Sequence, residues 1–267
     1  MWIDTHCHLD AHEFGAESPD VALRAAGLDV GMIVIPAVAR ANFDVVRSLA
    51  AALPNASYAL GIHPIYVPQA SDDDLAELRR QVESSLSDPN FVAIGEIGLD
   101  FFIPMLCEPD MRAKQERFLR EQLRIARDFD LPVLTHVRRS QDQVLKHVRQ
   151  IRPAGGVAHA FNGSFQQAKA FIDAGFQLGF GGAMTFTRAL QIRRLAEDLP
   201  LESIVLETDA PDISPAWVHP GRNSPEQLPA IGRALAGLRG VDADVVRAAT
   251  QASALAAIPR LAPLLAG

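Results

Sequence analysis

Seven side chains that can bind a metal ion or move a proton stand at or near the carboxyl ends of short apolar runs in this sequence. They are His6, His8, His63, Glu96, His136, His159 and Asp209. Imidazole nitrogens and carboxylate oxygens are common ligands of divalent metal ions in proteins. The pattern therefore predicts a metal site, provided that the fold brings the ends of these runs together.

The first pair of histidines has the spacing of two ligands on one strand. In a strand, residues i and i+2 point to the same face, so the imidazoles of His6 and His8 can hold one ion. Cys7 points the other way, and we expect it to be a packed thiol rather than a ligand. A His-x-His pair alone is a weak motif, but later histidines and carboxylates at other strand ends strengthen it.

Glu96 is embedded in the apolar run at 91–98, where an unpaired carboxylate would be costly. The arginines fall mostly in helical segments, so a metal ion is the expected partner, and two carboxylate oxygens can bridge two ions. Asp209 follows Glu207 by two residues, and both face inward in a strand. We expect Asp209 to be a ligand near the mouth and Glu207 to be a deeper, supporting group.

The candidate ligands are four histidines and two carboxylates. They are His6, His8, His136, His159, Glu96 and Asp209. A structural zinc site needs about four ligands and prefers cysteine, so this set favours two neighbouring ions that activate a water molecule. Asp209 can also accept the proton of that water. The sequence has no Gly-x-Ser-x-Gly elbow, no glycine-rich phosphate loop and no dinucleotide fingerprint.

Two further residues are candidates for substrate contact. His63 ends the run at 57–63 and is interpreted as a phosphate contact or proton donor, with a hydrogen-bonded loop histidine as the alternative. Arg138 follows His136 by two residues and can grip a phosphate through two parallel hydrogen bonds. The alternative for Arg138 is an ion pair with a loop carboxylate.

The elements that must position these residues alternate along the chain. Eight strand-like runs lie at 1–8, 30–38, 57–63, 91–98, 132–137, 156–161, 176–182 and 204–209. Helical patterns lie between or after them, at 72–87, 110–129, 140–152, 164–174, 187–198 and 225–239. This alternation predicts an α/β fold, a (β/α)8 TIM-type barrel forming a single domain over 1–267. The carboxyl ends of barrel strands meet at one mouth; a doubly wound sheet is the structural alternative.

Composition restricts the class of protein further. The chain of 267 residues has 48% hydrophobic residues and a net charge of −7, so a nucleic-acid binder that works by overall positive charge is excluded. Two cysteines give no disulfide framework. No apolar stretch is long enough for a membrane span, and the N-terminus lacks a signal-peptide pattern. We expect a cytoplasmic monomer without membrane contact or an obligate protein partner.

Eight short motifs occur in a fixed order. They are IDTHCHLD at 3–10, GIHP at 61–64, GEIGLDF at 95–101, LPVLTHVR at 131–138, HAFNG at 159–163, GFGGAMTF at 179–186, ETDAP at 207–211 and RNSPEQL at 222–228. Together they cover nearly the whole chain, which resembles the TatD family of metal-dependent hydrolases. The resemblance implies a TIM-type barrel and a metal-dependent nuclease, often a 3′→5′ exonuclease on DNA, so DNA ends are the expected substrate.

By the same resemblance, one ion is held by His6, His8, Glu96 and Asp209. The second is held by Glu96, His136 and His159, so Glu96 bridges two divalent ions. Mg²⁺ or Mn²⁺ are the expected working ions, whereas crystals can hold Zn²⁺ or Ni²⁺. The chain departs from the family pattern at Asn162 and at Ser253, where a loop contact and a local packing effect are expected.

Two other functions fit parts of this pattern. An amidohydrolase-type enzyme acting on a cyclic amide, ester or lactone would use the same His-x-His pair and paired metals. Many such enzymes bridge the ions with a carboxylated lysine, but the three lysines, Lys114, Lys146 and Lys169, all fall in helical segments. The other alternative is a binding module with a structural metal, which six ligands at an open mouth disfavour because structural sites are closed and saturated.

Overall fold

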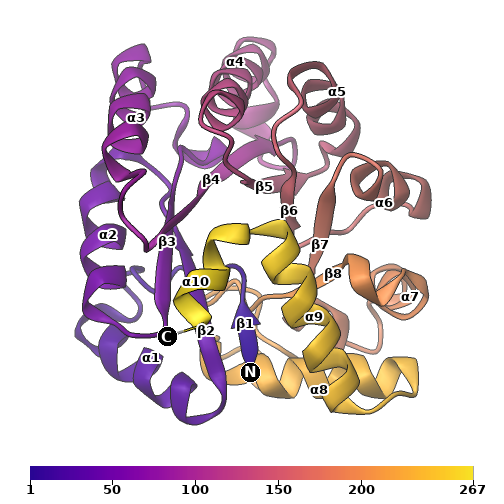
Figure 1. Ribbon diagram of the computed structural model, residues 1–267. Helices are drawn as coiled ribbons and strands as arrows, with labels where there is room; N and C mark the ends of the chain where they lie inside the picture. Colours follow the sequence, from indigo (N-terminus) through magenta and orange to yellow (C-terminus); the bar gives the residue numbers. More distant parts are fainter. Residues whose placement is uncertain (267) are drawn as a thin grey trace.

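A computed structural model of the chain describes residues 1–266, in which eight parallel strands form one sheet in the order β1 to β8 (Figure 1). The strands are β1 (Trp2–Asp4), β2 (Val30–Pro36), β3 (Ala56–Leu60), β4 (Phe91–Asp100), β5 (Val133–Arg138), β6 (Gly156–His159), β7 (Phe176–Phe180) and β8 (Ile204–Leu206). Each strand pairs with the next one along the chain, which is the order of a barrel and not of a doubly wound sheet.

The barrel is nearly closed by backbone hydrogen bonds between the segments at the ends of its first and last strands. Thr5 N donates to Leu206 O over 3.1 Å, and Asp209 N donates to His6 O over 2.8 Å. His8 N donates to Ala210 O, also over 2.8 Å. The segments that follow β1 and β8 therefore lie side by side at the carboxyl end of the barrel, and the predicted TIM-type fold is confirmed.

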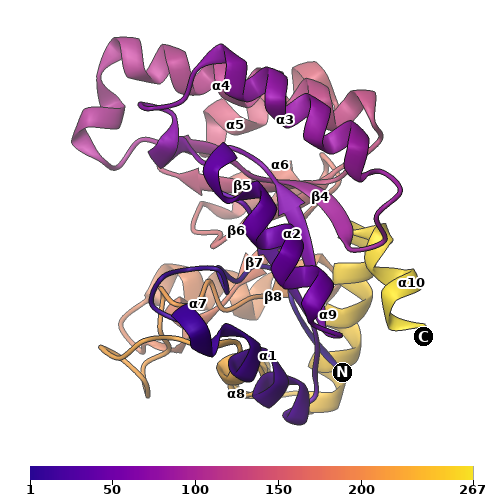
Figure 2. The same cartoon turned by 90° about the vertical axis from the view of Figure 1, so that its left-hand side faces the viewer.

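Helices surround the barrel, and the last two lie across its amino end (Figures 1 and 2). They are α1 (Ser18–Gly27), α2 (Phe43–Ala52), α3 (Asp72–Ser85), α4 (Pro109–Asp128), α5 (Gln141–Ile151), α6 (Phe165–Ile172), α7 (Leu190–Asp198), α8 (Leu228–Arg239), α9 (Ala243–Ala257) and α10 (Ala262–Leu265). The sequence patterns predicted α3 to α8 and missed the others. Within residues 1–266, none of the helices combines the length and the apolar character needed to cross a membrane.

Apolar side chains fill the barrel at its amino end. Alternate residues of β2 belong to two separate clusters: Ile33 packs in the layer between strands and helices, whereas Met32 packs with Ile258 and Leu261 of the C-terminal segment. Figure 2 shows α9, α10 and both chain termini on the same side of the barrel. The amino end is thus closed by hydrophobic packing, and polar side chains can gather only at the other end.

Several strands are shorter or longer than the apolar runs suggested. β1 ends at Asp4, β3 at Leu60 and β8 at Leu206, so His6, His8, His63 and Asp209 follow their strands and do not end them. Glu96 is instead internal to β4, which runs on to Asp100. The apolar runs continue past these strands because the chain stays buried while it bends around the barrel mouth.

Candidate metal centre

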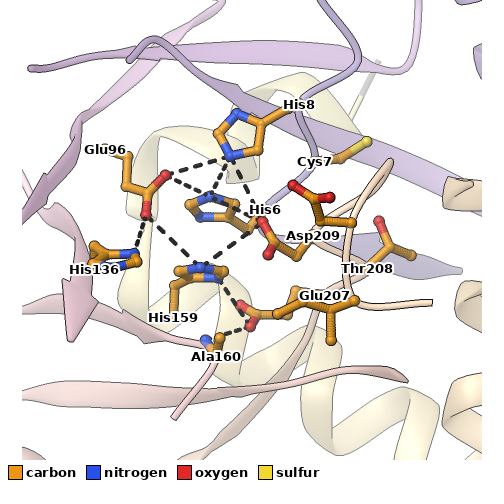
Figure 3. A network of polar contacts seen from close by, with 12 residues as sticks. His6, Cys7, His8, Glu96, His136, His159, Ala160, Glu207, Thr208 and Asp209 are labelled. Atoms are coloured by element: carbon orange, nitrogen blue, oxygen red, sulfur yellow. Dashed lines mark hydrogen bonds and ion pairs between the residues drawn. The ribbon is translucent and has the colours of Figure 1, made fainter. Parts of the chain in front are cut away.

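The predicted ligands come from separate strands and converge at the carboxyl end of the barrel (Figure 3). Around Oε2 of Glu96 lie Nε2 of His6 at 3.1 Å and Nε2 of His8 at 3.4 Å. Oδ1 of Asp209 lies 3.8 Å from the first of these nitrogens and 3.6 Å from the second. Four donor atoms thus surround one point beside the Glu96 carboxylate.

The other oxygen of Glu96 faces a second set of imidazoles. Its Oε1 lies 3.1 Å from Nδ1 of His136, 3.3 Å from Nε2 of His63 and 3.7 Å from Nε2 of His159. His159 is shared, because its Nε2 also lies 3.8 Å from Oδ1 of Asp209. The two carboxylate oxygens of Glu96 therefore point into two different groups of nitrogen and oxygen donors.

These spacings fit metal coordination. Ligand atoms about 2.1 Å from one tetrahedral ion are about 3.4 Å from each other, and the contacts around Glu96 range from 3.1 to 3.8 Å. His6 Nδ1 is buried without a hydrogen-bond partner among residues 1–266, so no hydrogen bond on that nitrogen turns the ring away from the cluster. Three groupings of side chains bring their donor atoms within 4.8 Å of one another, and each includes at least one of His6 and Glu96.

The charges at the centre also suit a divalent ion. Burial lowers the pKa of His8, but Glu96 and Asp209 raise it to about 9. Burial likewise lowers the pKa of His159, whereas Asp209 and Glu207 raise it to about 10. In the metal-free protein the carboxylates are thus balanced by protons on imidazoles, and a divalent cation bound to the same atoms would displace those protons.

Backbone conformation brings the strands close enough for these contacts. Gly98 of β4 pairs with His136 of β5, and a Cβ atom on this glycine would lie 2.0 Å from the His136 carbonyl oxygen. Asp209 and Ala160 both have positive φ angles, 54° and 44°. Such angles are uncommon for residues other than glycine, and they turn the chain at the points where β8 and β6 deliver their ligands.

Glu207 lies outside the cluster and holds one of its histidines, His159, in place. Oε1 of Glu207 accepts a hydrogen bond from Ala160 N over 2.6 Å and lies 3.1 Å from Nδ1 of His159. This contact fixes the ring so that its Nε2 faces Glu96, which is the supporting position expected for Glu207. Cys7 is buried with its sulfur directed away from the cluster, 3.7 Å from the Ala210 carbonyl oxygen (Figure 3).

Asp100 supports the centre in a way that sequence reasoning missed. Its Oδ2 lies 3.1 Å from Nε2 of His136, while its Oδ1 accepts hydrogen bonds from the backbone of Phe102 and Ile103. Burial raises the pKa of Asp100, but these hydrogen bonds lower it to about 2. Asp100 follows Glu96 by four residues on one strand, so period-two alternation places both on one face and could have identified it.

Asp4 was missed as well. Its Oδ1 accepts hydrogen bonds from Thr208 N over 2.9 Å and from His6 N over 3.3 Å, and its Oδ2 accepts one from the Thr208 hydroxyl over 2.6 Å. This buried carboxylate joins the ends of β1 and β8 directly beneath the cluster. The i, i+2 relation of Asp4 to His6 was the available indication in the sequence.

His63 lies inside the centre, although it was assigned no place among the ligands. Its Nδ1 accepts a hydrogen bond from Ile65 N over 3.1 Å, so the ring proton of the neutral imidazole is on Nε2. Burial lowers the pKa of His63 to about 4, which keeps the ring neutral. Nε2 therefore donates toward Oε1 of Glu96, and this geometry suits a hydrogen-bond donor better than a metal ligand.

Arg138 lies at the rim, half-exposed, with Nη1 3.8 Å from Oδ2 of Asp100. Arg138 thus has an ion pair, but its partner is the last residue of β4 and not the loop carboxylate considered from the sequence; the guanidinium also stacks over the Phe102 ring at 3.9 Å. Of the two departures from the family pattern, Asn162 lines the mouth and its carbonyl oxygen accepts from Gln141. Ser253 lies in α9 and donates to the carbonyl oxygen of Glu202.

A cavity of about 1610 Å³ opens above the cluster, and His8, Glu96, His136, His159 and Asp209 contribute to its walls. The candidate centre is therefore buried in protein on its lower side and accessible from solvent through the mouth. A site built in this way can bind metal ions and admit a substrate to them.

Comparison with known proteins agrees with this description. Residues 3–258 match the family described as TatD related DNase. The chain is 39% identical to YjjV of Escherichia coli K12, an uncharacterized metal-dependent hydrolase, over 92% of this chain and 93% of YjjV. The crystal structure of YjjV superposes with a TM-score of 0.90, covering 97% of this chain and 98% of that one.

Two further relatives extend the comparison. An uncharacterized metal-dependent hydrolase of Haemophilus influenzae is 37% identical over 93% of this chain and 96% of its own length. The tatdn3 protein of Danio rerio, whose name proposes a deoxyribonuclease, is 31% identical over 97% of this chain and 98% of its own. The chain belongs to the TatD-related DNase family of metal-dependent hydrolases.

Proposed function

We propose that this protein hydrolyses phosphodiester bonds at DNA ends, as a 3′→5′ exonuclease that uses two divalent metal ions. The observation that carries the proposal is the position of Glu96, whose two oxygens face separate groups of nitrogen and oxygen donors. A carboxylate in this position can hold two ions a few ångströms apart. Two ions held there would supply an activated water molecule and positive charge beside the phosphate oxygens.

The ligands divide between the two oxygens of Glu96. His6, His8 and Asp209 complete the group on Oε2, and His136 with His159 completes the group on Oε1. Glu207 and Asp100 hold the two rings of the second group from behind. Mg²⁺ and Mn²⁺ suit the carboxylates, and Zn²⁺ suits the imidazoles.

Two residues are assigned to proton transfer and substrate contact. Asp209 is 13% exposed toward the cavity and uses Oδ1 for its contacts with the histidines, so it is placed to accept a proton from the attacking water. His63 is held by Ile65 N with its Nε2–H directed into the centre, where it can donate to a phosphate oxygen. A phosphate oxygen at that place would compete with Glu96 for this proton.

A phosphodiester substrate is favoured over a cyclic amide or lactone by the rim of the cavity. Arg138 is half-exposed and can form two parallel hydrogen bonds with a phosphate. The name of the Danio rerio relative points to the same substrate class. A glutamate that bridges the ions would be compatible with either reaction, so the assay below compares both substrate classes.

The test uses protein stripped of metal and then supplied with Mg²⁺, Mn²⁺ or Zn²⁺. Single-stranded DNA labelled at the 5′ or the 3′ end, RNA of the same sequence and a lactone are offered in parallel. We expect metal-dependent shortening of DNA from the 3′ end. Turnover of the lactone without cleavage of either nucleic acid would contradict the proposal and favour the amidohydrolase alternative.

A further inference from the structure

A pair of arginines and a phenylalanine form one structural unit at the rim of the cavity. Arg138 is the last residue of β5 and pairs in register with Asp100, the last residue of β4, while Phe101 N donates to the Arg138 carbonyl oxygen over 2.9 Å. Phe102 therefore emerges beside the end of β5. The guanidiniums of Arg138 and Arg139 lie 3.9 and 4.7 Å from the centroid of its ring.

The backbone at Arg139 explains why two consecutive side chains reach one ring. Successive side chains of a strand point to opposite faces, so Arg139 would point away from Arg138 if β5 continued. Its φ of 55° lies in the left-handed region and turns the chain at this residue. An uncommon conformation of this kind, held next to an active-site cavity, is frequently part of a binding site.

The unit is held in a defined position before any ligand arrives. Oδ1 of Asp100 accepts hydrogen bonds from Phe102 N and Ile103 N, which fixes the segment that carries the ring. The ring is 45% exposed, and guanidiniums stacked on it keep their N–H edges available for anions. Among residues 1–266, no carboxylate lies within 4.0 Å of the Arg139 guanidinium, so this cation has no protein counter-ion.

Charges around the mouth are distributed unevenly. Within the described chain, Arg138 and Arg139 are the only arginines or lysines that line the cavity, and both follow β5. The opposite rim, which follows β1 and β8, carries Asp10, Glu13 and Asp212. In a protein with a net charge of −7, a second phosphate group is attracted to the first side and repelled from the other.

We propose that Arg139, stacked with Arg138 on Phe102, binds a second phosphate group of the substrate, next to the one that is hydrolysed. This inference rests on the proposed phosphodiester hydrolysis and adds a requirement to it. The substrate chain leaves the cavity across β4 and β5 only, and the end that is removed lies on the acidic side. Arg139 is thereby a residue that determines specificity for oligonucleotides over isolated phosphodiesters.

The test compares three thymidine dinucleotides: one without a terminal phosphate, one with a 5′-phosphate and one with a 3′-phosphate. Because removal from the 3′ end leaves the 5′ side of the chain at Arg139, we expect the wild-type protein to favour the form with a 5′-phosphate over the other two by about 10-fold in kcat/KM, the effect of one charge-assisted contact. In Arg139→Ala this preference should fall to nearly one. Phe102→Leu keeps an apolar side chain but removes the aromatic ring on which both guanidiniums stack, so the preference should fall about 3-fold.

Arg149→Ala is the matched control, since it removes an exposed arginine of α5 that does not line the cavity. The preference should be unchanged in this variant. Equal kcat/KM for all three dinucleotides in the wild type, or an undiminished preference in Arg139→Ala, would overturn the second-phosphate site while leaving phosphodiester hydrolysis intact. Failure to cleave any dinucleotide or end-labelled DNA would instead refute the proposed function, and the site with it.

Discussion

Gly179 of β7 offers a way to disturb the centre without touching a ligand. A Cβ atom on this residue would lie 2.1 Å from Oε2 and 2.5 Å from Cδ of Glu207. Contacts of that length are impossible, so Gly179→Ala must displace the carboxylate. Oε1 of the same carboxylate holds His159 Nδ1 and Ala160 N, and the displacement is therefore transmitted to a candidate ligand.

The size of the effect follows from these contacts. Loss of a group that orients a metal ligand weakens metal affinity by about 10- to 100-fold, which corresponds to about 1.4 to 2.8 kcal/mol. Separately, overpacking a buried position lowers the free energy of unfolding by about 1–3 kcal/mol. Alanine itself is tolerated by the backbone here, since the φ of Gly179 is not in the left-handed region. The steric contact with Glu207 is thus the cause of the expected loss.

The assay is competition between the protein and a chelating dye for Mn²⁺ or Zn²⁺, with the melting temperature of the metal-free protein measured alongside. Gly237→Ala in α8 is the control, because no atom lies within 4 Å of a Cβ added there. It should keep wild-type affinity. Metal affinity of Gly179→Ala equal to wild type, in a folded protein, would refute the orienting role of Glu207.

Three further predictions concern the centre and its substrate. Glu96→Ala removes the ligand shared by both groups, so metal-dependent hydrolysis should disappear while circular dichroism shows a folded protein; near-normal activity with two bound ions would make Glu96 purely structural. Acid should weaken metal affinity measured by calorimetry, because protons compete below the pKa values of His8 and His159, about 9 and 10. An affinity independent of pH contradicts that linkage. Oligonucleotide affinity in a non-cleaving metal should fall with salt with a slope of about one or two, since few phosphates are gripped; a slope of about five or more would require a basic tract elsewhere.

The barrel was predictable because apolar runs and helical patterns alternate evenly along the chain. The ends of the strands were less predictable: residues 2–7 of the run at 1–8 are all buried, yet only Trp2–Asp4 forms a strand. The apolar pattern reports which residues are buried. A strand ends where its pairing with the neighbouring strands ends, and the register of β1 against β8 depends on residues far apart in the sequence. Helices α1, α2, α9 and α10 were missed, and α9 in particular covers the amino end of the barrel through contacts distant in sequence.

The centre was predictable to the extent that its ligands lie in or directly after the strands; His6, His8 and Asp209 follow their strands, and His159 ends β6. Alternation along β4 could have placed Asp100 on the face of Glu96, but its contact with His136 could not be predicted, because only the β4–β5 register brings the two together. His63 was predicted at the mouth as a phosphate contact or proton donor, but its position beside Glu96 was not, because the hydrogen bond from Ile65 N decides which of its nitrogens faces Glu96. Tautomers and registers of this kind depend on three-dimensional contacts.

The central claim is that Glu96 bridges two divalent ions. Crystals grown with Mn²⁺ and measured for anomalous scattering test it most directly, because each ion gives its own peak. We predict two peaks a few ångströms apart, one on each side of the Glu96 carboxylate, with His6 and His8 at the first and His136 at the second. A single peak, or two peaks that do not share Glu96, would contradict the account.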